Sequence, residues 1–162
     1  MTPVIWSIAG TDSGGGAGLA ADQRAADAFG VHLCPVVAAV TAQSTTAVTQ
    51  VQAVAPELLE AQLEALAADL PPRVIKTGLL GSAANAHVVA RWVDRLRERG
   101  PVQLVIDPVL RASTGAAFAS DELLQAYREQ LLPRASVITP NQREAAALLG
   151  ADAANNVPGL AG

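Results

Sequence analysis

Residues 3–29 read PVIWSIAGTDSGGGAGLAADQRAADAF, and this stretch sets the expectation for the fold. Residues 3–9 form a short, nearly continuous apolar run, which is typical of a strand buried on both faces of a sheet. Residues 18–29 are rich in alanine and follow a helical pattern, and Gly30 fits the C-cap of that helix. A buried strand that leads through a glycine-rich turn into a helix is the first unit of a parallel α/β fold.

The same alternation of strands and helices continues along the chain. Further strands are predicted at residues 35–41, 73–77, 102–106 and 135–139, the first two of them buried, with a short edge strand around 48–54. Helices are predicted at residues 56–70, 82–99, 120–132 and 141–149, the middle two capped by Ser82 and Ser120. We therefore predict a single domain over residues 1–162, with a mainly parallel sheet between helix layers and an irregular tail at 151–162.

The composition narrows the class of protein. The 162 residues include 11 basic and 15 acidic side chains, so the net charge of −4 offers no basic footprint for nucleic acid or for an acidic membrane surface. No apolar stretch approaches the length that spans a bilayer, and no secretory leader precedes the first strand. Cys34 is the single cysteine, which excludes an internal disulfide, and we expect it to be buried and inert. We expect a soluble cytoplasmic protein.

The glycine-rich turn at residues 10–18 does not match either common phosphate-binding motif. A P-loop requires a lysine after its second glycine, and this stretch has none. A dinucleotide fingerprint requires G-x-G-x-x-G, and the frame that starts at Gly14 places Leu19 where the third glycine should stand. The turn is therefore either a plain connection between strand and helix or the floor of a ligand site.

Polar residues follow the predicted strands at their carboxyl ends, where parallel α/β sheets bind ligands. Gln43, within 41-TAQST-45, could pair with the edge of a heterocycle or belong to a polar loop that satisfies its own backbone. Lys76, the only lysine, could neutralise a phosphate or extend into solvent. Asp107 could hold magnesium or start an Asp-Pro turn, and residues 113–115 could form a second phosphate-contacting turn or an ordinary loop.

The block 139-TPNQRE-144 follows the last predicted strand. Asn141 and Glu144 have the spacing of a capping box, which needs no ligand. The same two residues could also organise a magnesium ion and the adjacent phosphates, and the two roles are compatible.

Taken together, these blocks resemble the hydroxymethylpyrimidine/phosphomethylpyrimidine kinases of the ribokinase-like superfamily. The matching blocks are, in chain order, 9-AGTDS-13, 15-GGAG-18 with 21-AD-22, 41-TAQST-45, 76-KTG-78, 107-DPV-109 and 139-TPNQRE-144. The resemblance spans residues 4–150 and implies a ribokinase-like three-layer α/β/α fold with a mainly parallel central sheet. Pyridoxal kinases share the last block, and they are the enzymatic alternative.

The resemblance implies a specific reaction. ATP would phosphorylate 4-amino-5-hydroxymethyl-2-methylpyrimidine and then its monophosphate, in thiamine biosynthesis, with Mg²⁺ as the cofactor. The pyrimidine is expected over the glycine turn, in contact with Gly10, Asp22 and Gln43. The ATP phosphates are expected near Lys76, Thr139 and Asn141, and the metal near Asp107 and Glu144.

The sequence also departs from the family. Thr11 stands where serine is usual, Ser44 where asparagine is usual, and residues 111–115 replace a segment that often carries lysine. Family members continue well past this length, and their Gly-Thr-Gly anion hole and catalytic base, which this chain lacks, lie in the C-terminal half, so the catalytic residues are expected beyond Gly162. We expect a C-terminally truncated kinase without catalytic residues, or a non-catalytic pyrimidine-binding module. A missing half would expose a sheet edge and favour association, and we expect a homodimer.

Overall fold

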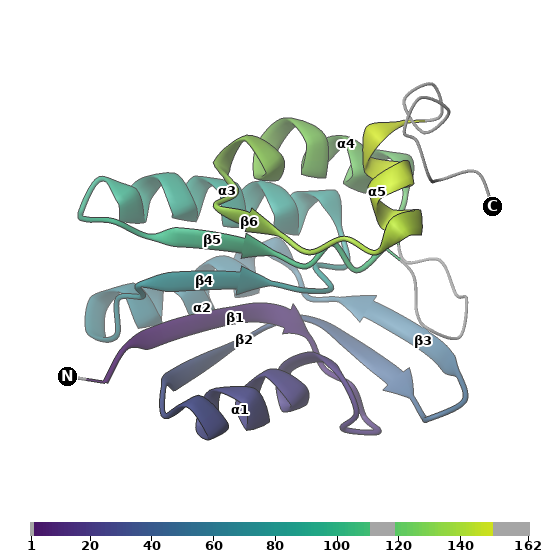
Figure 1. Cartoon of the computed structure of the whole chain (residues 1–162), viewed down its shortest axis with the longest axis horizontal. Coiled ribbons are helices and arrows are strands. Elements are labelled where there is room, and N and C mark those ends of the chain that lie inside the picture. The colour runs from purple at the N-terminus through teal and green to yellow at the C-terminus, as the bar shows by residue number, and fades with distance from the viewer. Residues whose placement is uncertain (1, 111–118, 151–162) are drawn as a thin grey trace.

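The computed structural model describes residues 2–110 and 119–150 (Figure 1). The strands are β1 (Val4–Gly10), β2 (His32–Gln43), β3 (Val48–Ala53), β4 (Val74–Thr77), β5 (Gln103–Ile106) and β6 (Val137–Ile138). The helices are α1 (Gly18–Phe29), α2 (Pro56–Asp69), α3 (Ala83–Arg97), α4 (Asp121–Ala126) and α5 (Gln142–Leu149). The predicted turn at 113–115 and the predicted irregular tail from residue 151 to Gly162 lie outside the described residues.

The six strands form one sheet in the order β3-β2-β1-β4-β5-β6. Neighbouring strands run parallel except for β3, which pairs antiparallel with β2 at the edge. The central strand β1 is paired on both sides; Ile5, for example, lies opposite Leu33 in β2 and opposite Val74 in β4. The carboxyl ends of β1, β2, β4 and β5 therefore meet at one edge of the sheet, which is where such folds bind ligands.

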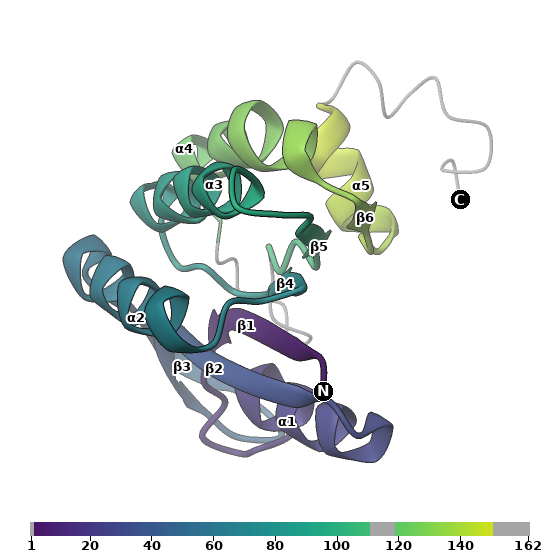
Figure 2. The same ribbon diagram turned by 90° about the vertical axis from the view of Figure 1, so that its left-hand side faces the viewer.

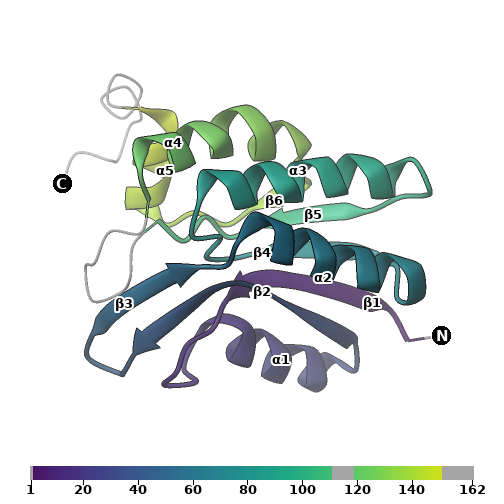
Figure 3. The same ribbon diagram turned by 180° about the vertical axis from the view of Figure 1, so that it is seen from behind.

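Helices cover both faces of the sheet. Helix α1 lies against β1 and β2 on one face, whereas α2, α3 and α4 lie on the opposite face (Figures 2 and 3). The hydrophobic core lies between the sheet and this second helix layer, and its large side chains, at most 3% exposed, include Trp6, Ile8, Leu63, Trp92 and Leu104. This is the predicted three-layer arrangement with a mainly parallel sheet.

Local signals fix the helix ends. Helix α1 spans the predicted residues, because Gly30 adopts a left-handed conformation (φ 66°) that closes it. Ser82 and Ser120 cap α3 and α4 as predicted, since their hydroxyls accept hydrogen bonds from the N–H groups of Asn85 and Leu123. These interactions span only a few residues, so the sequence alone could reveal them.

Strand β2 is longer than predicted. It spans His32–Gln43 rather than residues 35–41, because pairing with β1 extends one end and pairing with β3 extends the other. The predicted edge strand is confirmed as β3. The extra length of β2 depends on partners elsewhere in the chain, which no local window of sequence contains.

The predicted helix over residues 120–132 is wrong in its second half. It is α-helical only to Ala126 and continues as a π-helical turn, Tyr127–Leu131, and then a 3₁₀ turn, Leu132–Arg134. In the π turn the N–H of Leu132 bonds to the carbonyl of Tyr127, five residues back. Pro133 has no N–H to continue an α-helical ladder, which favours the irregular ending.

Cys34 lies buried in β2, as predicted. Burial raises the pKa of its thiol, and the charge of Asp69 adds to the rise, so the reactive thiolate is disfavoured. Within the described residues, no helix is both long enough and apolar enough to cross a membrane.

Candidate functional site

A cleft opens at the carboxyl ends of β1, β2, β4 and β5. Four residues that the sequence singled out line it together, namely Gly10, Gln43, Lys76 and Asp107. Its volume is about 230 Å³. Common ligand pockets span about 300–1,000 Å³, so this cleft suits a small single-ring molecule.

Asp12 organises the glycine-rich turn that forms one wall of the cleft. Its carboxylate accepts hydrogen bonds from the backbone N–H groups of Gly14 (2.8 Å), Gly16 (2.9 Å) and Ala17 (2.8 Å). The N–H groups that a bound phosphate would need are therefore already engaged, in agreement with the failed motif matches. The sequence analysis missed this role of Asp12, although an aspartate before a run of glycines is a known signal for a self-capped turn.

Gly18 closes the same turn at the start of α1. Its φ of 57° favours glycine, and an added Cβ would lie 2.3 Å from the carbonyl oxygen of Gly10. No other residue type could occupy this position without moving the backbone. The close approach explains why the strand can lead so tightly into the helix.

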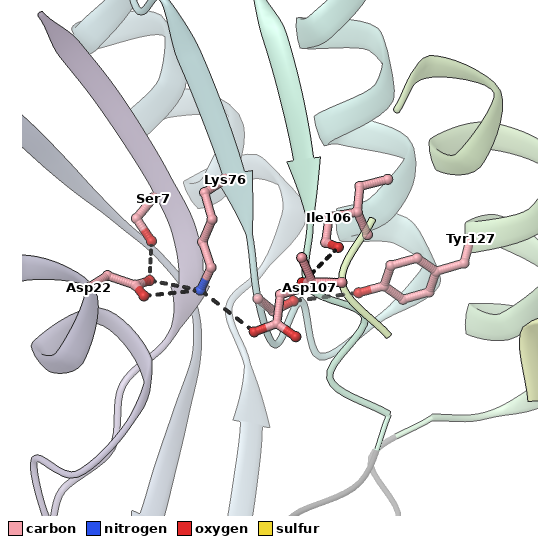
Figure 4. A network of polar contacts seen from close by, with 8 residues as sticks. Ser7, Asp22, Lys76, Ile106, Asp107 and Tyr127 are labelled. Atoms are coloured by element: carbon pink, nitrogen blue, oxygen red, sulfur yellow. Dashed lines mark hydrogen bonds and ion pairs between the residues drawn. The ribbon is translucent and has the colours of Figure 1, made fainter. Parts of the chain in front are cut away.

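Lys76 lies between two carboxylates (Figure 4). Its Nζ is 2.9 Å and 3.1 Å from the two oxygens of Asp22 and 3.9 Å from a carboxylate oxygen of Asp107. Ser7 donates a hydrogen bond of 2.5 Å to Asp22, so that carboxylate is held from two sides. The Lys76 side chain is only 24% exposed, so it does not extend into solvent. Lys76 lines the cleft, whereas Asp22, which was expected to contact the acceptor, is not among the residues that line it.

Asp107 follows β5 and is partly exposed in the cleft. Burial raises the pKa of its carboxyl group; the nearby Lys76 opposes this rise, whereas the charges of Glu144 and Asp22 add to it. The charges of Lys76, Glu144 and Asp22 therefore all act on the carboxyl group of Asp107.

The block at residues 139–144 lies beside the end of β5. The N–H of Thr139 donates to the carbonyl of Ile106 at 2.9 Å, which places the block next to Asp107. Asn141 and Glu144 form the predicted capping box: each side chain accepts the other's backbone N–H at 2.9 Å. The structural role of these two residues is thus confirmed.

The carboxylates of Asp107 and Glu144 could supply only some of the ligands that a metal ion needs. Among residues 2–110 and 119–150, no group of three or more His, Cys, Asp or Glu side chains is arranged to hold a metal ion. Asp107 and Glu144 supply two carboxylates, and the charge of Glu144 is close enough to raise the pKa of Asp107. Mg²⁺ usually takes one or two carboxylates and completes its shell with water and phosphate oxygens. The pair therefore fits an Mg²⁺ ion that arrives with a nucleotide.

Tyr127 is a buried residue that the sequence analysis did not single out. Its hydroxyl donates to the carbonyl of Gly78 at 3.4 Å, on the core side of the cleft wall (Figure 4). Burial, with the charges of Asp107 and Glu144, raises the pKa of Tyr127 well above its usual range, so it remains a hydrogen-bond donor. Its place depends on the π-helical turn, for which the sequence gives no clear signal.

Sequence comparisons identify a consistent set of relatives. A family model described as phosphomethylpyrimidine kinase matches residues 12–159. The hydroxymethylpyrimidine/phosphomethylpyrimidine kinase of Synechococcus elongatus is 43% identical over 150 residues, which cover 93% of this chain and 56% of that protein. The chain spans about half the length of the curated single-function relatives it matches, and a smaller share of the bifunctional ones.

Solved structures with the same fold include two kinds of vitamin kinase. The crystal structure of phosphomethylpyrimidine kinase from Clostridium difficile 630 has a TM-score of 0.80 at 33% identity, covering 89% of this chain and 61% of that one. A pyridoxal kinase from Staphylococcus aureus, in complex with AMP-PCP and pyridoxal, has a TM-score of 0.74 at 26% identity, covering 91% of this chain and 51% of that one.

Proposed function

The chain belongs to the phosphomethylpyrimidine kinase family, and from that premise we propose that it forms the acceptor-binding part of a kinase. The acceptors are 4-amino-5-hydroxymethyl-2-methylpyrimidine and its monophosphate, the phosphoryl donor is ATP, and the diphosphate product serves thiamine biosynthesis. The observation that carries this proposal is the cleft in which the glycine turn meets Gln43, Lys76 and Asp107.

Gln43 is the side chain best suited to recognise the acceptor ring. Its amide offers a donor and an acceptor side by side, which complements the ring nitrogen and exocyclic amine of a 4-aminopyrimidine. Gly10 and the turn that follows present bare backbone, which a flat ring can approach closely. Asp22 contributes through its ion pair with Lys76, which sets the polar wall of the cleft.

The phosphate side of the site belongs to the ends of β5 and β6. Asp107 and Glu144 would hold Mg²⁺, which when bound supplies positive charge to the transferring phosphoryl group. Asn141 uses its side-chain oxygen in the capping box, so its amide NH₂ is the group that would donate to phosphate oxygens, beside the hydroxyl of Thr139. Lys76 lowers the net negative charge there. The described residues would thus position the acceptor and the phosphates and neutralise phosphate charge, and none of them is assigned as a catalytic base.

The catalytic residues themselves are assigned to the region beyond Gly162, as the resemblance to the family implies. The structure describes no residue after 150, so the geometry of the cleft supports the binding roles and does not bear on the catalytic ones. The match to the Synechococcus elongatus kinase covers 56% of that protein, and its unmatched part is long enough to hold an anion hole and a base. Binding by this chain and turnover by a kinase are therefore separate questions.

The test separates binding from turnover. Calorimetry of the chain with the hydroxymethylpyrimidine should show saturable binding that Gln43→Ala weakens about tenfold, because the ring edge loses its paired hydrogen bonds. Thr46→Ala removes an exposed hydroxyl on the same hairpin and should leave the affinity unchanged. Turnover by the full-length protein with ATP and Mg²⁺ is then compared between the pyrimidine and pyridoxal. Absence of pyrimidine binding by the unsubstituted chain would overturn the proposal.

A pyridoxal kinase is the second candidate, and the similarity to the Staphylococcus aureus enzyme favours it. Both acceptors are six-membered nitrogen heterocycles that carry a hydroxymethyl group, so one cleft could accept either. Tighter binding of pyridoxal than of the pyrimidine would favour this candidate. Binding of the pyrimidine by this chain, with no turnover of it or of pyridoxal by the full-length protein, would instead identify a non-catalytic pyrimidine-binding module.

A homodimer is part of the same proposal. Strand β6 is an edge of the described sheet, and its two residues, Val137 and Ile138, are apolar and about half exposed. Exposed apolar edges favour pairing with another chain. Sedimentation measurements on the full chain test this part of the proposal independently of ligand binding.

A further inference from the structure

Hydroxyl side chains continue the ladder between β1 and β2 beyond the point where regular strand pairing ends. The last register pair joins Gly10 to Ala39, and the N–H of Thr11 donates to the carbonyl of Ala39 at 2.9 Å. The hydroxyl of Thr41 then donates to the carbonyl of Thr11 at 2.8 Å, and the N–H of Thr41 donates to the hydroxyl of Thr11 at 3.4 Å. The glycine turn is therefore joined to β2 through side chains.

Ser13 forms the next step of this hydroxyl ladder, two residues further along both segments. Its Oγ donates to the carbonyl of Gln43 at 2.7 Å and accepts the N–H of Gln43 at 2.7 Å. One hydroxyl thus engages both backbone groups of the residue that ends β2. Thr11, which stands where serine is usual, retains the hydroxyl that the preceding step of the ladder uses.

Gln43 occupies a position where the backbone needs such support. The register between β2 and β3 shifts between Ala42 and Gln43, and an irregularity of this kind changes the direction of a side chain. The residues that follow, 44–46, are exposed. Gln43 lines the cleft, and its Oε1 lies 3.4 Å from the hydroxyl of Thr41. The orientation of its amide therefore depends on where the ladder holds its backbone.

We propose that Ser13 is a positioning residue for acceptor recognition: by clamping the backbone of Gln43 to the glycine turn, it presets the amide of Gln43 to receive the ring. The inference rests on the proposed function, because it needs a ring that Gln43 recognises. Asp12 gives the turn its internal shape, and Ser13 then sets the distance between that turn and Gln43. Presetting a binding group strengthens binding because less ordering is required when the ligand arrives.

The experiment is a double-mutant cycle measured by calorimetry with 4-amino-5-hydroxymethyl-2-methylpyrimidine. Ser13→Ala should weaken binding about tenfold, since two hydrogen bonds that orient Gln43 are lost. Ser13→Thr retains the hydroxyl and should restore most of the affinity, and Thr46→Ala is the matched control. In a Gln43→Ala background, Ser13→Ala should change the affinity by less than about twofold, because the group that it positions is gone. A purely structural role would give the same loss in both backgrounds.

A ligand-free measurement completes the test. Hydrogen exchange at the amide of Gln43 should become faster in Ser13→Ala, because that N–H loses its acceptor, and should not change in Thr46→Ala. Unchanged exchange, or equal affinity of Ser13→Ala and the unsubstituted chain, would overturn the inference alone. Failure of the unsubstituted chain to bind the pyrimidine would overturn the proposed function and this inference with it.

Discussion

Lys76 determines how much uncompensated negative charge the cleft contains. Lys76→Met would leave Asp22 and Asp107 without their shared cation, and we expect it to lower the free energy of unfolding by about 2 kcal/mol. Urea unfolding followed by tryptophan fluorescence measures this loss. Arg91→Met removes an exposed cation from a surface pair with Glu60 and should cost less than about 1 kcal/mol. Equal losses for the two variants would show that the Lys76 pair acts as an ordinary surface ion pair.

The turn requires glycine at position 18. Gly18→Ala would combine a left-handed backbone with a Cβ placed 2.3 Å from the carbonyl oxygen of Gly10, so we expect a loss of about 3 kcal/mol. Gly30→Ala has the same backbone sign but no atom within 4 Å of the added Cβ, and should cost about 1 kcal/mol. Similar unfolding midpoints for the two variants would contradict the proposed steric origin.

The elements of the fold were predictable where their ends depend on neighbouring residues. Helix α1 was correct because Gly30 closes it, and α5 was correct because Asn141 and Glu144 cap it. Strand β2 was too short and the helix after Ser120 too regular, because strand pairing and a π-helical turn depend on distant partners. Short-range chemistry can be read from the sequence, whereas pairing over long distances cannot.

The same division applies to the candidate site. Gly10, Gln43, Lys76 and Asp107 were brought together, because parallel strands align their carboxyl ends. The hydroxyl clamp of Ser13 escaped sequence analysis, since it joins residues 30 positions apart. The ligand roles assigned to all these residues remain predictions until binding is measured.

The contact between α3 and the 3₁₀ turn, Leu132–Arg134, predicts a dependence of stability on pH. Arg134 donates to both carboxylate oxygens of Asp94, at 2.7 to 3.0 Å, and this hydrogen bonding lowers the pKa of Asp94 in the folded state. A lowered folded pKa stabilises the fold above the unfolded pKa, about 4, and the stabilisation is lost as pH falls through the folded pKa.

Asp94→Asn should therefore be less stable than the unsubstituted chain by about 0.5 kcal/mol at pH 7, the range expected for a partly exposed pair. The gap should shrink below pH 4 and vanish once the carboxyl group is protonated in both states. Urea unfolding across this pH range measures it, and 1 M salt should reduce the gap at pH 7 by screening. A gap of constant size from pH 7 to pH 3 would contradict the ionic origin.

The whole molecule has unequal sheet faces. Three helices, α2, α3 and α4, cover one face over the main core, whereas α1 covers β1 and β2 on the other (Figure 2). Beside α1 lies an apolar groove of about 290 Å³ whose walls include Ile5, Phe29 and Leu33. The described part of the chain thus exposes apolar side chains at two places, the groove beside α1 and the edge strand β6. Exposed apolar surface of this kind marks sites of association.

We expect the chain to associate through the edge strand β6. Ile138 is 45% exposed there, and unpaired N–H and C=O groups of an edge strand can continue the sheet into a second copy. Sedimentation velocity at increasing protein concentration should show association, and Ile138→Lys should weaken it, because a lysine on the edge opposes strand addition.

Leu58→Lys is the matched control, since Leu58 is 57% exposed but lies on helix α2 and not on strand β6. It introduces the same charge and removes a similar apolar side chain, so a general effect of charge on solubility would appear equally in both variants. Edge pairing predicts that only Ile138→Lys shifts the chain toward the monomer. A monomer at every concentration would exclude association altogether. An equal shift in the two variants would exclude association through β6, because the effect would then not depend on which element carries the substitution.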